Sequence, residues 1–186
     1  MNITVVGAGY VGLVAACCLA KSGHQIIAVE NDEYKLSQLK QGVVPIYEKG
    51  LKDILHEVTA QKQITFTSDL REALPTASIV IIAVGTPSLQ DGRVDLSQVN
   101  GVAKTISELA DNPLTVVMKS TVPPGTGKSL YNRYFSKAKA SVHYVSNPEF
   151  LREGKAVWDW YNTDRIVIGS DTAEAAKLME ELYVDI

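Results

Sequence analysis

Three glycines near the N-terminus have the spacing of a turn that holds a phosphate. Gly7, Gly9 and Gly12 fit the pattern G-x-G-x-x-G, which gains meaning only between a strand and a helix. Here an apolar, β-branched run precedes it and a run of small, helix-compatible residues follows it. Gly7 permits a tight turn, Gly9 lets a pyrophosphate approach the backbone, and Gly12 allows close helix packing. The segment predicts a dinucleotide site, with the phosphates at the N–H groups of a helix that starts at about Val11.

An acidic residue that could discriminate between dinucleotides follows a second predicted strand at 25–29. Glu30 stands directly after this strand, where a carboxylate would accept hydrogen bonds from an adenosine ribose. Its charge would repel a ribose 2′-phosphate, which favours NAD over NADP. The alternative interpretation is a structural glycine turn with an unrelated surface Glu30.

Segment 122–129 is only a partial match to a second type of phosphate-binding loop. It ends in Gly-Lys-Ser, as a Walker A loop does, but Val122 stands where that loop has its first glycine. Pro123 and Pro124 also remove two backbone N–H groups that such a loop would turn towards phosphates. We therefore expect Lys128 to be an exposed residue early in a helix.

Three further polar segments each follow a predicted strand. Thr86 follows strand 79–84, Thr121 follows strand 115–118, and the segment 147–154 follows strand 142–145. In an open α/β sheet, ligands bind beyond the carboxyl ends of the strands. Turns also favour glycine, threonine, asparagine and proline for structural reasons, so position alone leaves both roles open.

Two glutamates of the third segment have helical spacing. Glu149 and Glu153 lie four residues apart and would share one face if a helix starts after Pro148. Like charges this close repel unless a ligand or cation lies between them, which favours a functional role.

The cysteines and histidines do not form a recognisable catalytic or metal-binding set. Cys17 and Cys18 are adjacent, and neighbours do not readily reach disulfide geometry. Neither has a cysteine or histidine at a metal-ligand spacing, and we predict no metal. We expect reduced thiols packed in a helix, in a reducing cytoplasm, and structural or surface roles for His24, His56 and His143.

The elements that must position these residues alternate between strand and helix. This order predicts one α/β domain over residues 1–186, with a doubly wound, mostly parallel sheet of Rossmann type and helices on both faces. Asp32 and Asp95 are predicted to cap two of the helices. The expected strands are 3–6, 25–29, 64–67, 79–84, 115–118, 142–145 and 166–168, and the expected helices run from the glycine turn to about 22, from 33 to about 41, 51–60, 96–110 and 172–183.

Composition excludes several classes of protein. The 186 residues are 46% hydrophobic and 21% charged, which is typical of a folded globular domain. A net charge of −3 disfavours nucleic acid as a partner. The longest stretch free of polar residues, Val11 to Ala20, is about half the length of a membrane span, and no basic residue precedes it as in an export signal.

Four motifs together resemble the nucleotide-sugar dehydrogenases, the UDP-glucose/GDP-mannose dehydrogenase family. They are Gly-Ala-Gly-Tyr-Val-Gly at 7–12, Val-Gly-Thr-Pro at 84–87, Lys-Ser-Thr-Val-Pro-Pro-Gly at 119–125 and Asn-Pro-Glu-Phe-Leu-Arg-Glu-Gly at 147–154. Their order and spacing agree over essentially the whole chain, and they look most like the members that act on UDP-glucose. Members acting on GDP-mannose or UDP-N-acetylhexosamines share the fingerprint, so the sugar and the base stay open. A short NAD-binding module without catalysis is the alternative from another class.

The resemblance implies oxidation of the sugar C6 alcohol to a carboxylate, with two hydrides passed in succession to two NAD molecules. It implies a water, held by Thr121 and Glu149, that serves proton transfer and hydrolysis of an acyl intermediate. It places the nucleotide sugar, UDP-glucose by this comparison, at Glu149, Phe150, Leu151, Arg152 and Glu153. It places NAD at Gly7, Gly9, Tyr10, Val11, Gly12, Glu30, Lys35, Thr86, Thr121 and Glu153.

The resemblance also implies parts that this sequence does not contain. The family's nucleophilic cysteine lies in a Gly-Gly-x-Cys segment of a C-terminal half that also carries a catalytic lysine, a central dimerisation helix and a UDP-binding domain. No Gly-Gly-x-Cys segment occurs here. We therefore expect this chain to bind NAD without completing turnover, and the full-length enzyme to be a cytoplasmic homodimer that makes a polysaccharide precursor. The aromatic segment 158–162 could pack on the absent half or, as a loop, on its own domain.

Overall fold

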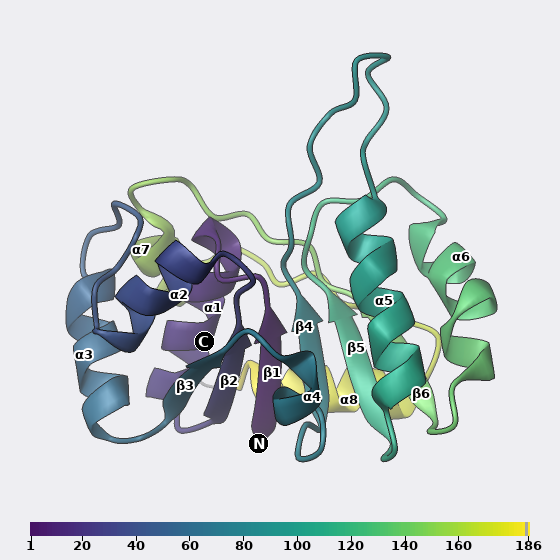
Figure 1. Cartoon of the computed structure of the whole chain (residues 1–186), viewed down its shortest axis with the longest axis horizontal. Coiled ribbons are helices and arrows are strands. Elements are labelled where there is room, and N and C mark those ends of the chain that lie inside the picture. The colour runs from purple at the N-terminus through teal and green to yellow at the C-terminus, as the bar shows by residue number, and fades with distance from the viewer. Residues whose placement is uncertain (185) are drawn as a thin grey trace.

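A seven-stranded sheet forms the centre of the computed structural model, which describes residues 1–184 and 186 (Figure 1). Its strand order is β3-β2-β1-β4-β5-β6-β7, and every neighbouring pair is parallel except β6 and β7. This order confirms the predicted doubly wound, Rossmann-type sheet. The strands are β1 (Asn2–Val6), β2 (Gln25–Val29), β3 (Ile64–Thr67), β4 (Ile79–Ile82), β5 (Leu114–Met118), β6 (Val142–Ser146) and β7 (Gly169–Ser170).

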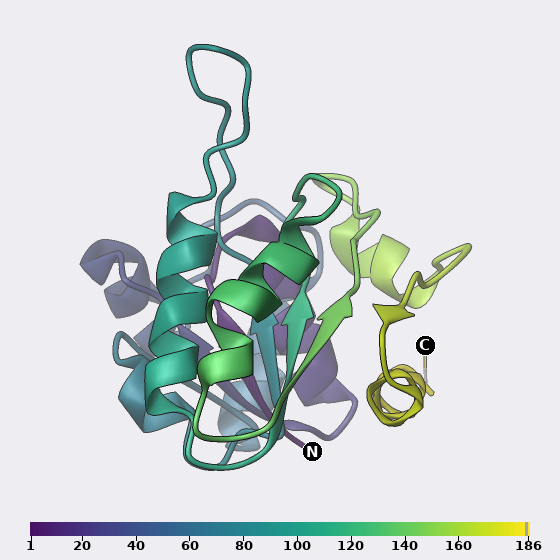
Figure 2. The same cartoon turned by 90° about the vertical axis from the view of Figure 1, so that its right-hand side faces the viewer.

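Helices cover both faces of the sheet, as Figure 2 shows from its edge. One face packs against α1 (Tyr10–Lys21), α3 (Leu51–Ala60), α7 (Ala156–Tyr161) and α8 (Ala173–Leu182). The other packs against α4 (Leu70–Ala73), α5 (Ser97–Leu109), α6 (Thr126–Arg133) and the 3-10 turn η1 (Phe135–Lys137). The remaining helix, α2 (Glu33–Lys40), lies beside β3.

Side-chain alternation along the strands explains the two apolar cores. Val5 and Val6 are neighbours in β1, yet Val5 belongs to the core beneath α1 and Val6 to the core beneath α5. Successive strand residues point to opposite faces, so a sheet covered on both sides requires continuous apolar strands. The central strands β4 and β5 are accordingly buried along their whole lengths.

The parallel strands bring their carboxyl ends to one edge of the sheet. At this edge β1 pairs with β2 on one side and with β4 on the other, so the strand order reverses at β1, the position where open α/β sheets bind their ligands. The segment that follows β4 projects from the same edge as a long loop (Figure 2), and Ser88 and Val94 form an isolated β-bridge within it.

Most predicted elements are confirmed, including α2 with Asp32 as its N-cap, whereas the N-cap of α5 is Leu96 and not the predicted Asp95. The Asp32 side chain accepts a hydrogen bond from the Lys35 N–H at 3.0 Å, and Asp95 accepts one from the Ser97 N–H at 2.8 Å. Within the described residues no helix has the length and apolar character needed to cross a membrane.

Near the C-terminus one predicted strand was wrong, and two possibilities that the sequence left open, a helix after Pro148 and a loop at 158–162, are not found. Residues 166–168 form no strand; instead β7 at 169–170 pairs antiparallel with the end of β6. No helix follows Pro148, so Glu149 and Glu153 do not share a helical face. The aromatic segment considered as a loop contains most of helix α7. The pairing of β7 joins Ser170 to Val145 and Gly169 to Ser146, and local patterns do not register partners so distant in sequence.

Candidate functional site

The glycine turn packs tightly on the sheet but stays open at its middle glycine. Gly7 has φ +95°, and a Cβ added there would lie 2.7 Å from the Ala83 carbonyl oxygen. A Cβ at Gly12 would lie 1.8 Å from the Gly7 carbonyl oxygen, whereas one at Gly9 would meet no atom within 4 Å. Two glycines are therefore required by packing, and Gly9 leaves space above the backbone. A pyrophosphate fits such a cradle.

Helix α1 presents its N-terminus at this opening. It begins at Tyr10 with Gly9 as the N-cap, and no side chain caps it. Its first N–H groups, among them that of Val11, have no acceptor one turn earlier in the helix, and the helix dipole is positive there. This arrangement favours an anionic group beyond Gly9.

Glu30 lies beside the glycine turn and is 6% exposed. Its Oε2 accepts a hydrogen bond from the Ala8 N–H at 3.2 Å, and its Oε1 accepts one from the Asp32 N–H at 2.9 Å. Each carboxylate oxygen can accept a further hydrogen bond, so the ribose role predicted for Glu30 remains available. Lys35, half-buried in the first turn of α2, is on the chain segment that follows.

Tyr10 directs its hydroxyl away from the turn. The Oη lies 2.6 Å from Glu48 Oε2 and 2.7 Å from the Arg152 carbonyl oxygen, both of which can accept its proton. Burial, together with the hydrogen bond to Glu48, raises the pKa of Tyr10 above its ordinary value. Glu48 also accepts a hydrogen bond from the Val157 N–H at 3.3 Å. This buried carboxylate was missed by the sequence analysis, because its partners are 38 and 109 residues away.

Three loops meet at the ends of the neighbouring strands β4, β5 and β6. The Ser120 hydroxyl donates to the Val84 carbonyl oxygen at 2.7 Å, and the Asn147 N–H donates to the Met118 carbonyl oxygen at 2.9 Å. These bonds fix the loops that carry the predicted site residues Thr86, Thr121 and Glu149. Thr86 and Glu149 are half-buried, while Thr121 and Glu153 are exposed.

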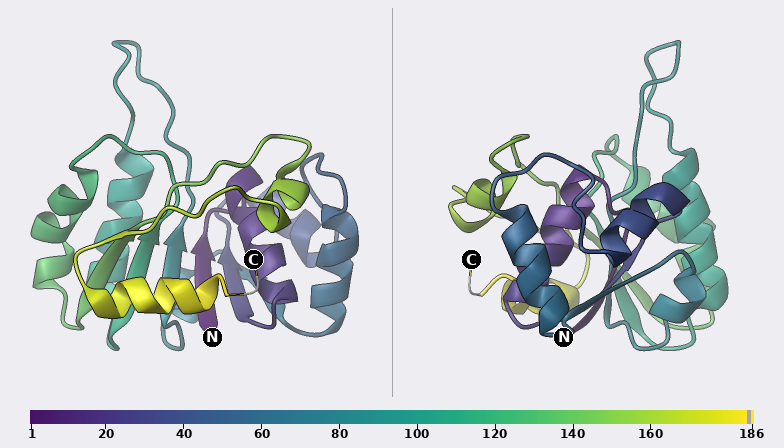
Figure 3. Two further views of the ribbon diagram at one scale, coloured as in Figure 1. Left: turned by 180° about the vertical axis from the view of Figure 1, so that it is seen from behind. Right: turned by 60° about the vertical axis from the view of Figure 1, so that its left-hand side comes forward.

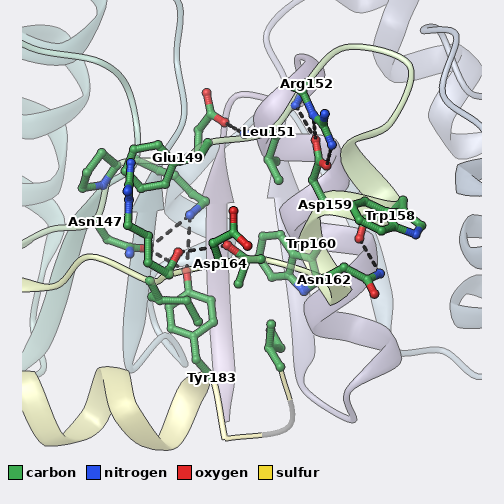
Figure 4. Close-up of a pocket in the computed structure, with 17 residues that line it drawn as sticks. Asn147, Glu149, Leu151, Arg152, Trp158, Asp159, Trp160, Asn162, Asp164 and Tyr183 are labelled. Carbon is green, nitrogen blue, oxygen red and sulfur yellow. Dashed lines mark hydrogen bonds and ion pairs between the residues drawn. The ribbon is translucent and has the colours of Figure 1, made fainter.

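A cavity of about 350 Å³ lies beside the ends of β5 and β6 (Figure 4). Lys119 and Asn147 line it from the strand ends, helix α7 adds two tryptophans and Asp159, and Tyr183 comes from the end of α8. Figure 3 shows α8 lying across the back of the sheet. Of the residues predicted to bind substrate, those that line the cavity are Glu149, Phe150, Leu151 and Arg152.

The guanidinium of Arg152 is paired within the domain. Its Nη2 lies 2.5 Å from Asp159 Oδ1, its Nε donates to Asp159 Oδ2 at 3.1 Å, and its backbone N–H donates to the same oxygen at 2.8 Å. These bonds hold the pKa of Asp159 below its ordinary value. A two-point pair of this kind fixes geometry, so Arg152 anchors its loop to α7.

The two cysteines are unsuited to nucleophilic chemistry. Both are completely buried in α1, and burial raises the pKa of Cys18 to about 12 and that of Cys17 still further above its ordinary range. A thiol is reactive as its thiolate, which burial suppresses here. Among the described residues no three histidine, cysteine or acidic side chains are placed to hold a metal ion.

Gly127 in the partial Walker motif has a packing role. A Cβ at this position would lie 2.3 Å from a ring carbon of Tyr144, so the glycine lets α6 approach β6 closely. Lys128 is exposed in the first turn of α6, as predicted.

Comparison with known proteins assigns this chain to a family. The protein-family model described as "UDP-glucose/GDP-mannose dehydrogenase family, NAD binding domain" matches residues 1–186. The chain is 45% identical over 184 residues to UDP-glucose 6-dehydrogenase TuaD of Bacillus subtilis, covering 98% of this chain and 40% of that protein. It is 46% identical over 188 residues to a UDP-glucose 6-dehydrogenase of Rhizobium meliloti, covering 98% of this chain and 43% of that protein. The chain thus spans about two fifths of these relatives.

Solved structures agree with the same assignment. A GDP-mannose dehydrogenase from Pseudomonas aeruginosa, determined as a ternary complex, matches with a TM-score of 0.96 and 32% identity, covering 100% of this chain and 44% of that one. A UDP-glucose dehydrogenase from Pyrobaculum islandicum matches with a TM-score of 0.93 and 35% identity, covering 98% of this chain and 43% of that one.

Proposed function

The chain belongs to the UDP-glucose/GDP-mannose dehydrogenase family, as its NAD-binding domain, and from this premise we propose that the protein carrying it oxidises UDP-glucose to UDP-glucuronate with two NAD. The observation that carries the proposal is the identity of 45–46% to two UDP-glucose 6-dehydrogenases across nearly the whole chain. The GDP-mannose dehydrogenase structure is less similar in sequence, at 32%, and its substrate is therefore the second candidate.

The residues around the glycine turn fit the cofactor. The open space over Gly9 and the N-terminus of α1 would receive the pyrophosphate, and Glu30 and Lys35 would hold the adenosine ribose. The negative charge of Glu30 favours NAD over NADP. Thr86, Thr121 and Glu153 would complete the site towards the nicotinamide. Bound NAD supplies the acceptor for the hydride.

The loops after β5 and β6 would act on the sugar. We propose that Thr121 and Glu149 hold the water that takes up the proton of the alcohol and later attacks the acyl intermediate. A carboxylate held by neighbouring groups is suited to this general-base role. The segment 149–153 would bind the nucleotide sugar, with Arg152 acting through its backbone and its pairing with Asp159.

The covalent step needs groups outside this chain. With Cys17 and Cys18 buried, we propose that the nucleophilic cysteine, a catalytic lysine, the UDP-binding domain and the dimerisation helix belong to the rest of the protein. The chain alone would then bind NAD without turnover. Two free, buried thiols and the use of NAD support a cytoplasmic location, and we propose a homodimer that supplies a polysaccharide precursor.

The test is the stoichiometry of the native-length protein with defined sugars. We expect two NADH for each UDP-glucose consumed, with kcat/KM at least about tenfold lower for GDP-mannose and for UDP-N-acetylglucosamine. The 186-residue chain should produce no NADH from any of them. Preference for GDP-mannose, or one NADH per sugar, would contradict the proposal.

A further inference from the structure

A lysine is buried at the end of β5, at the base of the cavity. Lys119 is 5% exposed. Its Nζ donates to Asn147 Oδ1 at 3.2 Å and to the Tyr183 hydroxyl at 3.3 Å, and Tyr183 in turn donates to Asn147 Oδ1 at 2.6 Å. The ammonium also lies 5.5 Å from the centre of the Trp160 ring. Figure 4 shows Asn147, Trp160 and Tyr183 directed towards the centre of this group.

Burying the charged ammonium of Lys119 costs folding free energy. Among the residues that the structure describes, no carboxylate lies within ion-pair distance of its Nζ, and its hydrogen-bond partners are neutral. Burial lowers the pKa of Lys119 to about 8, although attraction to Glu149 partly opposes this effect. Replacing a buried charge by an apolar side chain of similar volume is often neutral or stabilising. Stability alone therefore does not explain a lysine here.

The position of Lys119 between two site loops offers another explanation. Thr121 follows it by two residues, and its partner Asn147 precedes Glu149 by two. Asn147 is further fixed by donating to the Val167 carbonyl oxygen at 2.8 Å. The Lys119–Asn147 bond thus joins the loop after β5 to the loop after β6, at the point where both leave the sheet.

We propose that Lys119 is a positioning residue, whose buried ammonium holds the Glu149 loop against the Thr121 loop through its hydrogen bond to Asn147. This inference rests on the proposed oxidation of a nucleotide sugar. Lys119 would act through Asn147, which precedes Glu149 by two residues, and not through contact with the reacting atoms.

The direct test is Lys119→Met in the native-length protein, with Lys128→Met as the matched control because Lys128 is exposed on α6. We expect Lys119→Met to lower kcat at least tenfold, to leave the dissociation constant of NAD within twofold, and to melt at an equal or higher temperature at pH 7. The control should change none of the three. A variant that keeps its kcat, or that fails to fold or melts well below the wild type, would overturn the proposal.

The pH profile gives a second readout that a merely structural role would not move. In the wild type, kcat should fall as the pH rises through about 8, where Lys119 loses its proton, and this decline should be missing in Lys119→Met. The charged and titratable groups that share the cavity with it are Glu149, Arg152, Asp159, Asp164, Arg165 and Tyr183. Arg152 and Asp159 pair with each other, Arg165 stacks on Phe150, and burial raises the pKa of Tyr183 above its ordinary value.

The outcomes separate this inference from the function on which it rests. A wild-type protein that oxidises none of the nucleotide sugars would contradict the proposed function. An active wild type whose alkaline decline persists unchanged in Lys119→Met would overturn only the role of Lys119.

Discussion

The Tyr10 hydroxyl lies 2.6 Å from the Oε2 of Glu48, a buried carboxylate in the loop between α2 and α3. The same hydroxyl lies 2.7 Å from the Arg152 carbonyl oxygen. One side chain of the glycine turn thus contacts both the α2–α3 loop and the segment predicted to bind the substrate. Tyr10, predicted as a cofactor residue, therefore joins the glycine turn to the predicted substrate segment.

Tyr10→Phe tests this link. Removing the hydroxyl leaves the Oε2 of the buried Glu48 carboxylate without the Tyr10 hydrogen bond, and an unsatisfied buried acceptor typically costs about 1–3 kcal/mol. The free energy of unfolding in urea should fall by that amount, while the dissociation constant of NAD changes less than threefold. Tyr47→Phe is the control, because Tyr47 is 89% exposed. A large loss of NAD affinity without a loss of stability would show that the hydroxyl serves the cofactor directly.

The glycine turn predicts opposite effects for two alanine substitutions. Gly9→Ala adds a Cβ with no atom within 4 Å, so the domain should keep its stability but bind NAD at least about tenfold more weakly, because the methyl group occupies the phosphate cradle. Gly12→Ala puts a Cβ 1.8 Å from the Gly7 carbonyl oxygen and should unfold or severely destabilise the domain. Calorimetric titration and thermal melting measure the two effects. Equal behaviour of the two variants would contradict the account of the turn.

Glu30→Ala should weaken the binding of NAD more than the binding of NADP. The substitution removes a charged acceptor, and hydrogen bonds to charged groups contribute about 1.5–3 kcal/mol, which corresponds to roughly 10–100-fold in affinity. It also removes the charge that repels a 2′-phosphate, so the preference for NAD should shrink. Glu33→Ala, an exposed change at the start of α2, serves as the control. An unchanged ratio of NAD to NADP affinity would argue against a ribose role for Glu30.

The buried charge of Lys119 predicts an unusual dependence of stability on pH. Its pKa is about 8 in the folded chain and near 10.5 for an ordinary lysine. Between pH 8 and pH 10.5 the lysine therefore keeps its proton in the unfolded chain but has lost it in the folded chain. Folding stability from this group therefore rises with pH across that window and is lowest below about pH 8. Lys119→Met should exceed the wild type by up to about 3 kcal/mol at pH 7, and the gain should shrink towards pH 10. Urea unfolding at several pH values measures the difference, and a gain that grows with pH would contradict the assignment.

Local sequence patterns were sufficient for the elements that carry the cofactor turn. The apolar run before Gly7, the glycine spacing and the Asp32 cap each determine their structure within a few residues. Continuous apolar strands such as β4 likewise required burial on both faces. The Rossmann-type sheet followed from this repeated alternation.

What the sequence did not reveal depends on long-range contacts. Nothing near Glu48 indicates that Tyr10 will bind it from 38 residues away. Lys119 reads as a polar loop residue until Asn147 and Tyr183 enclose it, 28 and 64 residues later. The β-branched residues at 166–168 suggested a strand, but only Gly169 and Ser170 reach the edge of β6. Such sites are created by tertiary packing.

The most direct test of the central claim is a calorimetric titration of the 186-residue chain with NAD and, separately, with NADP. We predict one NAD bound per chain, with NADP bound at least about tenfold more weakly because of Glu30. Failure to bind either dinucleotide, or a preference for NADP, would contradict the assignment of Gly9 and Glu30 to an NAD site.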